Sequence, residues 1–361
     1  MKIAVIGANG FIGTRIVEMF HLSARHAVVP IVRRPAGLAR PARFSVDWRI
    51  ADALDGAALT KALAGCDAAV HAALGDPRQI EAMPAILCAA AAAARVPRVI
   101  YLSSATVHGQ APASGTTETT ALQCDHPILY NNAKVRAERA FFRGCARHGL
   151  TGFALRPGVV FGPRSRWIAD ANTSLRSGRA AWLNGGRGIC NSLYVDNLVE
   201  AIHLALLAPG RGGEAFLVGD AETVTWRDFL GPVARHAGLD VSAFADLPVP
   251  SFVPERESRV ATLTLSPAYG RIGPLLPARA KRLVKAVLRA WPEPAPAADA
   301  WTLPAATRPL GLSHELALLQ QCTWKFPHAR ATARLGYQPT VTFTEGMARS
   351  LAWLDFADGR T

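Results

Sequence analysis

The feature that most constrains the fold is a glycine-rich turn near the N-terminus. Residues 3–6 form a short apolar run typical of a buried strand, and the segment GANGFIG at residues 7–13 follows it. Apolar residues then recur at helical spacing, at positions 12, 16, 17 and 20. Glycines let backbone N–H groups approach a pyrophosphate, and the start of a helix adds partial positive charge. The pattern therefore predicts a strand–turn–helix unit that binds a dinucleotide.

The first 220 residues alternate between apolar strand-like runs and helical stretches. Strands separated by amphipathic helices are typical of a parallel sheet with helices on both faces. We therefore predict an α/β fold built on a doubly wound parallel Rossmann sheet. The strands are expected at residues 2–6, 28–32, 45–50, 68–72, 98–103, 152–156 and 215–218, and the helices near 12–23, 56–64, 80–95, 130–148 and 195–208.

The composition changes near residue 220, where prolines become frequent and the alternation of strands and helices fades. We predict an NAD(P)-binding Rossmann domain over residues 1–219, with an excursion near 163–190 that reaches the substrate side. Residues 220–361 are expected to form a smaller, mostly helical domain. Because a Rossmann sheet binds its ligands at the carboxyl ends of its strands, this second domain would bind the substrate above that edge.

The chain carries a formal net charge of +13, and only six of its 40 Lys and Arg residues are lysines. A basic balance fits nucleic acid, a membrane surface or an anionic substrate. The arginines are spread along the whole chain, and no nucleic-acid recognition motif accompanies them. We therefore predict no nucleic-acid partner. A lysine retained in such a chain is expected to be needed for its compact ammonium group.

The sequence also argues against membrane, secreted and metal-binding classes. No apolar run reaches the roughly 18 residues that a membrane span needs, and a strand that begins near residue 3 leaves no room for a signal peptide. The six cysteines show no CxxC or Cys/His ligand spacing. We expect a cytoplasmic protein with reduced cysteines and no metal.

The end of the second strand indicates which dinucleotide binds. A carboxylate at this position would bind the ribose 2′-hydroxyl, whereas an arginine accommodates a 2′-phosphate. The chain has Arg33 and Arg34 here and no acid, which favours NADP(H) over NAD(H). The alternative is that both are ordinary surface arginines, and NAD then remains a candidate.

Two other strand ends offer contacts to the cofactor. Asp52, after the third strand, could accept a hydrogen bond from the adenine amine, although an aspartate here is more often a turn residue or a helix cap. Ala72 and Ala73 end the fourth strand with small side chains, where a cofactor could lie close to the backbone. We expect the neighbouring His71 to be structural.

The candidate catalytic residues follow the fifth strand. That strand ends in Ser103 and Ser104, and Tyr130 opens a helix in which Lys134 follows on the same face. A free phenol has a pKa of about 10 and is a poor base, so a neighbouring ammonium and an oxidised nicotinamide are expected to lower the pKa of Tyr130. Tyr130 would exchange a proton with the substrate oxygen while a hydride moves. Ser104 would hold that oxygen, and Ser103 would contact the cofactor.

Six segments together resemble the extended short-chain dehydrogenase/reductase superfamily, of the NAD-dependent epimerase/dehydratase type. The resemblance implies that Ser104, Tyr130 and Lys134 form the catalytic triad and that Pro157 lies against the nicotinamide. It places the pyrophosphate along Gly7, Asn9, Gly10, Phe11, Ile12 and Gly13, and it suggests a homodimer formed through a helix face. The matching segments are GANGFIG (7–13), LSSATVHG (102–109), YNNAK (130–134), RPGVVFGP (156–163), LYVDNL (193–198) and LGYQP (335–339).

The chain departs at three positions from the nucleotide-sugar enzymes of this superfamily. Residues 158–160 read Gly-Val-Val where those relatives have asparagines. Cys190 stands where they place an arginine that clamps a diphosphate, and the nearest arginine is Arg187. Both departures weaken a nucleotide-sugar function. Ile80 stands at a further asparagine position, which puts a solvent-linked proton relay in doubt.

Residues 277–291 form a basic amphipathic segment in which Leu283, Val287 and Trp291 share one helical face with other apolar residues. This pattern is typical of a helix on an anionic bilayer surface. It is equally typical of a surface helix packed on its own core. Peripheral membrane contact through this segment would fit a lipophilic substrate.

Two classes of function remain. The first is an NAD(P)(H)-dependent oxidoreductase that acts on a small-molecule secondary alcohol or ketone. Within it, the departures favour a carbonyl reductase or alcohol dehydrogenase similar to hydroxysteroid dehydrogenases, with a nucleotide-sugar epimerase or dehydratase as the alternative. The second class is a non-catalytic NADP-binding sensor, which would not need Ser104, Tyr130 and Lys134 together.

Overall fold

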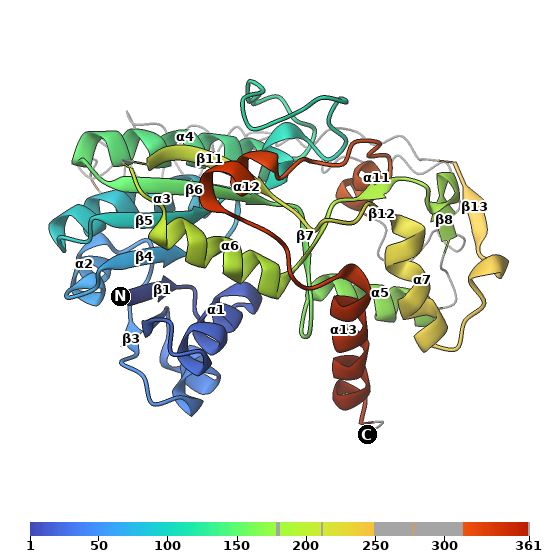
Figure 1. Cartoon of the computed structure of the whole chain (residues 1–361), viewed down its shortest axis with the longest axis horizontal. Helices are drawn as coiled ribbons and strands as arrows, with labels where there is room; N and C mark the ends of the chain where they lie inside the picture. Colours follow the sequence, from blue (N-terminus) through green and yellow to red (C-terminus); the bar gives the residue numbers. More distant parts are fainter. Residues whose placement is uncertain (178–180, 211, 249–276, 278–312, 360–361) are drawn as a thin grey trace.

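A seven-stranded parallel sheet forms the centre of the molecule (Figure 1). The computed structural model describes residues 1–177, 181–210, 212–248, 277 and 313–359. The strands are β1 (Lys2–Ile6), β2 (Ala27–Val32), β3 (Arg49–Ile50), β4 (Ala68–His71), β5 (Arg98–Leu102), β6 (Thr151–Pro157) and β11 (Gly212–Val218). Their order is β11-β6-β5-β4-β1-β2-β3, with every pairing parallel. The order reverses between β1 and β4, and open α/β sheets bind ligands outside the carboxyl ends of the strands at such a point.

Apolar side chains fill both faces of this sheet. Successive residues of a strand point to opposite faces, so Ile3 and Val5 join one core cluster while Ala4 and Ile6 join the other. Burial on both sides explains why β1 is a continuous apolar run. Helices α1 (Phe11–Leu22) and α6 (Val195–Leu207) pack on the first face, and α2 (Gly56–Leu63), α3 (Pro77–Ala93) and α4 (Leu129–His148) pack on the second.

The doubly wound Rossmann prediction is confirmed, but the third strand is much shorter than the predicted 45–50. Only Arg49 and Ile50 pair with β2. Upstream, the N–H of Val46 bonds the Phe44 carbonyl and the N–H of Trp48 bonds the Val46 carbonyl. An edge strand has a neighbour on one side alone, so local turns compete with the ladder for these backbone groups.

Short elements gather beyond the carboxyl ends of the central strands, on the right of Figure 1. They include part of the predicted 163–190 excursion, and helix α13 (Phe343–Ala357) packs beside them. Helix α12 (Ala329–Leu335) instead returns to β11, where Arg330 and Arg334 pair with Glu214. The limits of the two expected domains at residues 219 and 220 stay a prediction. The elements of this group are β7 (Val159–Phe161), α5 (Arg166–Arg176), β8 (Ala181–Leu183), β9 (Ile189–Cys190), β10 (Ser192–Tyr194), β12 (Val224–Thr225), α7 (Trp226–His236), β13 (Ala245–Leu247) and α11 (His314–Leu319).

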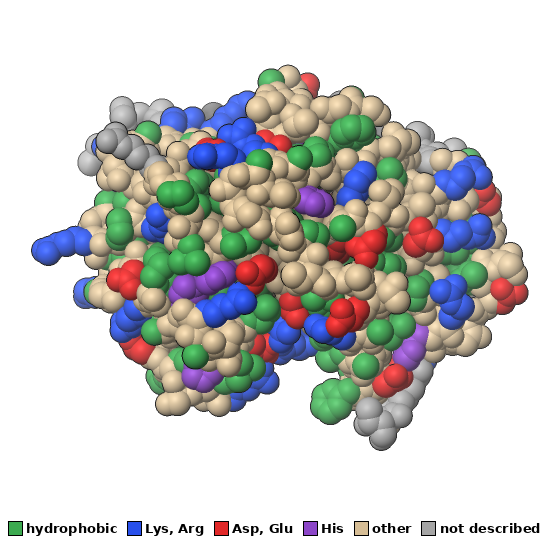
Figure 2. Space-filling model, viewed as in Figure 1, with side chains coloured by type: hydrophobic (Ala, Val, Ile, Leu, Met, Phe, Trp, Pro, Cys, Tyr) green, Lys and Arg blue, Asp and Glu red, His purple; other side chains and the backbone are tan. Residues whose placement is uncertain are grey.

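Basic and acidic side chains are interspersed over the face shown in Figure 2. Among the described helices, none is long and apolar enough to cross a membrane. The described residues also hold no group of three or more His, Cys, Asp or Glu that could bind a metal ion. All six cysteines are free thiols. The basic segment 277–291 lies outside the described residues except for Pro277.

Candidate active site

The glycine turn between β1 and α1 is as tight as the sequence predicts. Gly7 has a φ of +84°, which favours glycine. A Cβ on Gly7 would lie 2.7 Å from the backbone nitrogen of Ala73, and a Cβ on Gly13 would clash with the Gly7 carbonyl oxygen. Gly10 caps α1 without a side-chain hydrogen bond, so N–H groups of the first helical turn can bind an anion. Asn9, Phe11 and Ile12 belong to this same turn.

The loop after β2 folds back over the glycine turn. Arg33 and Arg34 are exposed at its start, and no ion pair of either is found within the described residues. The short helix η1 (Pro35–Ala39) brings Gly37 close to the Asn9 side chain. Arg40 then donates from Nη1 to the Asn9 carbonyl oxygen at 3.1 Å. Arg40 was missed in the sequence, where the repeated arginines of this loop were the available signal.

Two further strand ends lie at the same edge of the sheet. The Asp52 Oδ1 accepts the N–H of Leu54 at 3.0 Å, so this carboxylate forms a turn. Its predicted contact with adenine stays a prediction. The N–H of Ala72 bonds the Ile6 carbonyl at 2.9 Å, which places Ala72 and Ala73 directly beside the glycine turn.

Ser104, Tyr130 and Lys134 meet at the carboxyl ends of the strands. Ser104 follows β5 and begins the short helix η3 (Ala105–His108), while Tyr130 lies in the first turn of α4. The phenol of Tyr130 and the hydroxyl of Ser104 line the same cavity, and the Ser104 hydroxyl acts to lower the pKa of the phenol. One helical turn further, the Lys134 Nζ lies 5.8 Å from the centre of the Tyr130 ring and donates to the Leu102 carbonyl oxygen at 3.0 Å.

Burial dominates the titration of this pair. It lowers the pKa of the Lys134 ammonium to about 8, against the opposing effect of Glu138. It also raises the pKa of the Tyr130 phenol above its usual range, against the opposing effect of the Ser104 hydroxyl. The predicted lowering of the Tyr130 pKa by Lys134 is not found: the pKa is raised, because desolvation disfavours the phenolate, and Lys134 is not among the groups that shift it. Tyr130 keeps its proton at neutral pH.

A buried ion pair lies next to the candidate catalytic residues. Glu138 lies one turn beyond Lys134 on α4 and pairs with Arg156 at the end of β6, both less than 5% exposed. The Ser103 hydroxyl donates to Glu138 at 2.6 Å, and Arg156 also contacts the Nε2 of His108 at 3.0 Å. Ser103 thus points to this network, and its predicted contact with the cofactor stays a prediction. The network was missed in the sequence, where the Lys134–Glu138 spacing was the available signal.

Pro157 ends β6 and leads the chain into the site. A Cβ on the next residue, Gly158, would clash with the Asn191 carbonyl oxygen. The chain therefore passes close to Asn191 here, and Gly158 and Val159 line the cavity that holds Tyr130. The predicted contact of Pro157 with the nicotinamide is untested.

The cavity at Ser104 and Tyr130 has a volume of about 690 Å³. Polar side chains in its lining include those of Ser104, Thr106 and Tyr130, and Glu315 adds a negative charge that further raises the pKa of Tyr130. The only arginine that lines it among the described residues is Arg166, whose exposed side chain pairs with Asp170 at 3.5 Å. Apolar side chains supply most of the remaining wall: Trp167, Leu175, Ile189, Trp226, Phe229, Leu230, Leu316, Leu319 and Phe326.

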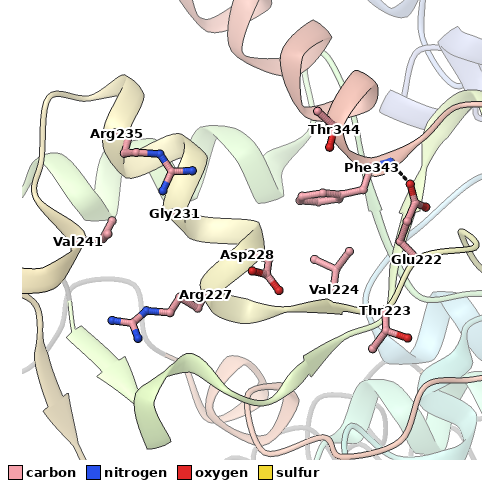
Figure 3. A pocket seen from close by; sticks show the side chains of 10 residues that line it. All are labelled: Glu222, Thr223, Val224, Arg227, Asp228, Gly231, Arg235, Val241, Phe343 and Thr344. Carbon is pink, nitrogen blue, oxygen red and sulfur yellow. Dashed lines mark hydrogen bonds between the residues drawn. The ribbon is translucent and has the colours of Figure 1, made fainter.

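A second hollow lies on the other side of α7 (Figure 3). Arg227 and Arg235 border it from α7, and Glu222 lies near the start of α13, where it accepts the N–H of Phe343 at 2.8 Å. Asp228, in the middle of the hollow, caps α7 through Thr225. Ser104, Tyr130 and Lys134 do not line this hollow, so the candidate active site is the larger cavity.

Comparison with known proteins identifies the family of the chain. The model of the NAD dependent epimerase/dehydratase family matches residues 3–219, more than half of the chain. The chain belongs to this family. It is therefore an enzyme of the extended short-chain dehydrogenase/reductase type.

Individual relatives of this family are distant from the chain. It is 23% identical over 379 residues to a 3beta-hydroxysteroid-dehydrogenase/decarboxylase of Arabidopsis thaliana, covering 96% of this chain and 61% of the relative. The chain thus spans less than two thirds of that protein. It is 26% identical over 251 residues to a 4-hydroxy-2-methyl-3-oxo-4-farnesyl-3,4-dihydroquinoline-1-oxide ketoreductase of Stigmatella aurantiaca, covering 66% and 74%. The fold is similar to that of DesIV, a dTDP-glucose 4,6-dehydratase of Streptomyces venezuelae solved with NAD and TYD bound, with a TM-score of 0.68, 20% identity and coverage of 100% and 98%.

Of the departures from the nucleotide-sugar enzymes, Gly158 and Val159 line the cavity, whereas Cys190 and Ile80 lie outside it. Cys190 is fully buried in β9 and does not line the cavity. Arg187 is exposed and donates to Asn184 at 2.8 Å. Neither residue places a guanidinium in the cavity where a diphosphate would need one. Ile80 is buried in the core between the sheet and α3.

Proposed function

We propose that this enzyme transfers a hydride between NADP(H) and a secondary alcohol or ketone on a lipophilic, non-nucleotide molecule. The observation that carries the proposal is the apolar wall of the cavity that ends at Ser104 and Tyr130. Binding sites of this kind hold an apolar body and orient it through a few polar groups. A diphosphate, by contrast, needs guanidinium or ammonium groups within reach.

The reacting end suits the reduction of a carbonyl group. Burial keeps the Tyr130 phenol protonated, so it can donate that proton to the carbonyl oxygen as the oxygen gains charge. Ser104 lies beside Tyr130 and can donate a hydrogen bond to the same oxygen. When bound, the nicotinamide supplies the hydride. In the oxidation of an alcohol the same proton returns to Tyr130.

The residues of the first strand ends fit a dinucleotide. Glycine backbone atoms and the start of α1 can hold the pyrophosphate. Arg33 and Arg34, with Arg40 beside Asn9, offer guanidinium groups where a 2′-phosphate would lie. These arginines support NADP(H) as the preferred cofactor of an enzyme whose family is described as NAD dependent.

Two relatives support the substrate class. One is named for a hydroxysteroid and the other for the ketoreduction of a farnesyl-bearing quinoline oxide. Both names describe alcohols or ketones on apolar frameworks. An apolar cavity in this chain is consistent with a substrate of the same class.

The proposal is tested by supplying the purified enzyme with NADPH and a panel of ketones. The panel contains ketosteroids and prenylated ring ketones, with UDP-glucose and dTDP-glucose as the competing class. We expect oxidation of NADPH with at least one lipophilic ketone, and a loss of about 100-fold or more in kcat for Tyr130→Phe. Conversion of the nucleotide sugars alone would replace the proposed substrate class. Tight NADPH binding without turnover of any compound would favour a sensor.

A further inference from the structure

The Ser104 hydroxyl is hydrogen-bonded to Thr106. Its Oγ lies 2.9 Å from the Oγ1 of Thr106 and accepts the backbone N–H of Thr106 at 3.2 Å. Ser104 is only 8% exposed, so little water competes for these bonds. Thr106 lines the same cavity as Tyr130. The Thr106 and Ser104 hydroxyls are thus hydrogen-bonded to each other in the cavity that Tyr130 also lines.

The number of bonds that Ser104 can make limits the direction of this chain. A serine hydroxyl has one proton and two acceptor lone pairs. The Thr106 N–H occupies one lone pair. If the Thr106 hydroxyl donates to the other, the Ser104 proton is left for Tyr130 or the substrate oxygen. If Ser104 donates to Thr106 instead, it has no proton to offer at the reacting end.

We propose that Thr106 is a positioning residue that directs the Ser104 hydroxyl toward Tyr130 and the substrate oxygen. The inference rests on the proposed proton transfer at this site. The β-branched side chain of Thr106 has few rotamers, and the buried neighbours Ala105 and Val107 hold η3 in place. The Thr106 hydroxyl is therefore held at 2.9 Å from the Ser104 hydroxyl.

A purely structural role accounts for only one of the two contacts between Ser104 and Thr106. Ser104 caps η3 by accepting the Thr106 N–H, and any residue at position 106 supplies that group. The contact between the two hydroxyls adds nothing to the cap. It bears on the orientation of the Ser104 proton.

Other groups that face Tyr130 act on the phenol directly. Lys134 lies along α4, Tyr101 comes from β5, and Glu315 comes from α11. None of them is hydrogen-bonded to the Ser104 hydroxyl in the described part of the chain. The contact through which a change at Thr106 should reach the reacting end is therefore its hydrogen bond with Ser104.

The test is a double-mutant cycle between Thr106→Val and Ser104→Ala in the full chain. It uses whichever carbonyl compound or nucleotide sugar the enzyme converts, so failure of the lipophilic substrate class does not affect it. We expect Thr106→Val to lower kcat about tenfold with KM within about twofold, because one charge-assisted hydrogen bond is weakened in the transition state. Thr106→Ser should restore most of kcat, and Thr106→Val should have no further effect in Ser104→Ala.

Three kinetic results would overturn the inference. They are wild-type kcat in Thr106→Val, a Thr106→Ser variant as slow as Thr106→Val, or an equal loss from Thr106→Val in the Ser104→Ala background. Thermal unfolding of each variant checks that the fold is retained.

A second measurement needs no substrate. The five tyrosines are labelled with ¹³C at Cζ, and Tyr130→Phe identifies the signal of Tyr130 in the NADP⁺ complex. We expect this signal to move in Thr106→Val and to stay at the wild-type position in Thr106→Ser. An unchanged signal in Thr106→Val would also overturn the inference.

Discussion

At the scale of single residues, the arginines near the glycine turn differ in what they contact. Arg15, Arg43 and Arg164 all pair with the buried carboxylate of Glu18, and these bonds lower the pKa of Glu18 despite the opposing effect of burial. Those arginines stabilise the fold. Arg33 and Arg34, by contrast, have no ion pair within the described residues and lie at the end of β2. Their charges remain available to a phosphate.

The availability of Arg33 predicts a preference for NADPH. We expect NADPH to bind more tightly than NADH. Arg33→Ala should reduce the ratio of the two affinities about tenfold, since hydrogen bonds between charged groups contribute about 1.5–3 kcal/mol. Fluorescence titration of both cofactors measures the effect. Arg95→Ala is the matched control, because Arg95 precedes β5 at the opposite edge of the sheet. Equal affinities of the wild-type enzyme for the two cofactors would refute the preference.

At the scale of elements, the β1–turn–α1 unit is where sequence and structure agree most closely. Each glycine of the turn has a separate requirement, because Gly7 needs a positive φ and Gly13 lies against the Gly7 carbonyl. Gly10 is less restricted. A Cβ there would lie 3.3 Å from the Gly7 oxygen, and its φ of −70° suits any residue.

These differences predict unequal effects of alanine along the turn. Gly13→Ala should weaken cofactor binding more than about tenfold and lower the free energy of unfolding by about 3 kcal/mol, because the backbone must move to relieve the clash. Gly10→Ala should cost less than about 1 kcal/mol. Urea unfolding and cofactor titration give the two quantities. Similar losses in both variants would mean that the turn is looser than the structure shows.

Features that depend on residues close together in the sequence could be predicted, whereas contacts between distant parts of the chain could not. The glycine turn and the Tyr130–Lys134 pair follow from spacings within one element, and the structure brings both to the same edge. The Glu138–Arg156 pair joins α4 to β6, and no local pattern reveals which arginine a glutamate will meet. Helix α11 and Ser104 line the same cavity, although about 200 residues separate them in the sequence. Such contacts are set by tertiary packing, so spacing alone could not give them.

At the scale of the whole molecule, several histidines are buried in neutral form. Burial lowers the pKa of His26 to about 4, of His71 to about 3 and of His108 to about 4. In the unfolded chain these groups titrate at about 6.5. The unfolded state therefore binds more protons below that pH, and stability falls as the pH falls. Asp220 acts in the opposite direction, because burial raises its pKa to about 6.

This balance predicts acid sensitivity in a mild pH range. When the pH falls from about 7.5 to about 5.5, each of the three histidines should lower the free energy of unfolding by about 1.4 kcal/mol. Asp220 should raise it by about 0.8 kcal/mol, so the net loss is about 3 kcal/mol. Urea unfolding at the two pH values measures this loss. His71→Gln removes one titrating group and should reduce the loss by about 1.4 kcal/mol. Equal stability of the wild-type protein at both pH values would contradict the assignment of buried neutral histidines.

Two separate groups of elements line the cavity. Its reacting hydroxyls come from η3 and α4, which rest on the central sheet, whereas α5, α7 and α11 supply the far wall. Substitutions in those three helices can reshape the space offered to the body of a molecule while the groups that move the proton keep their positions. Selectivity in this scaffold can therefore drift or be redesigned without rebuilding its chemistry.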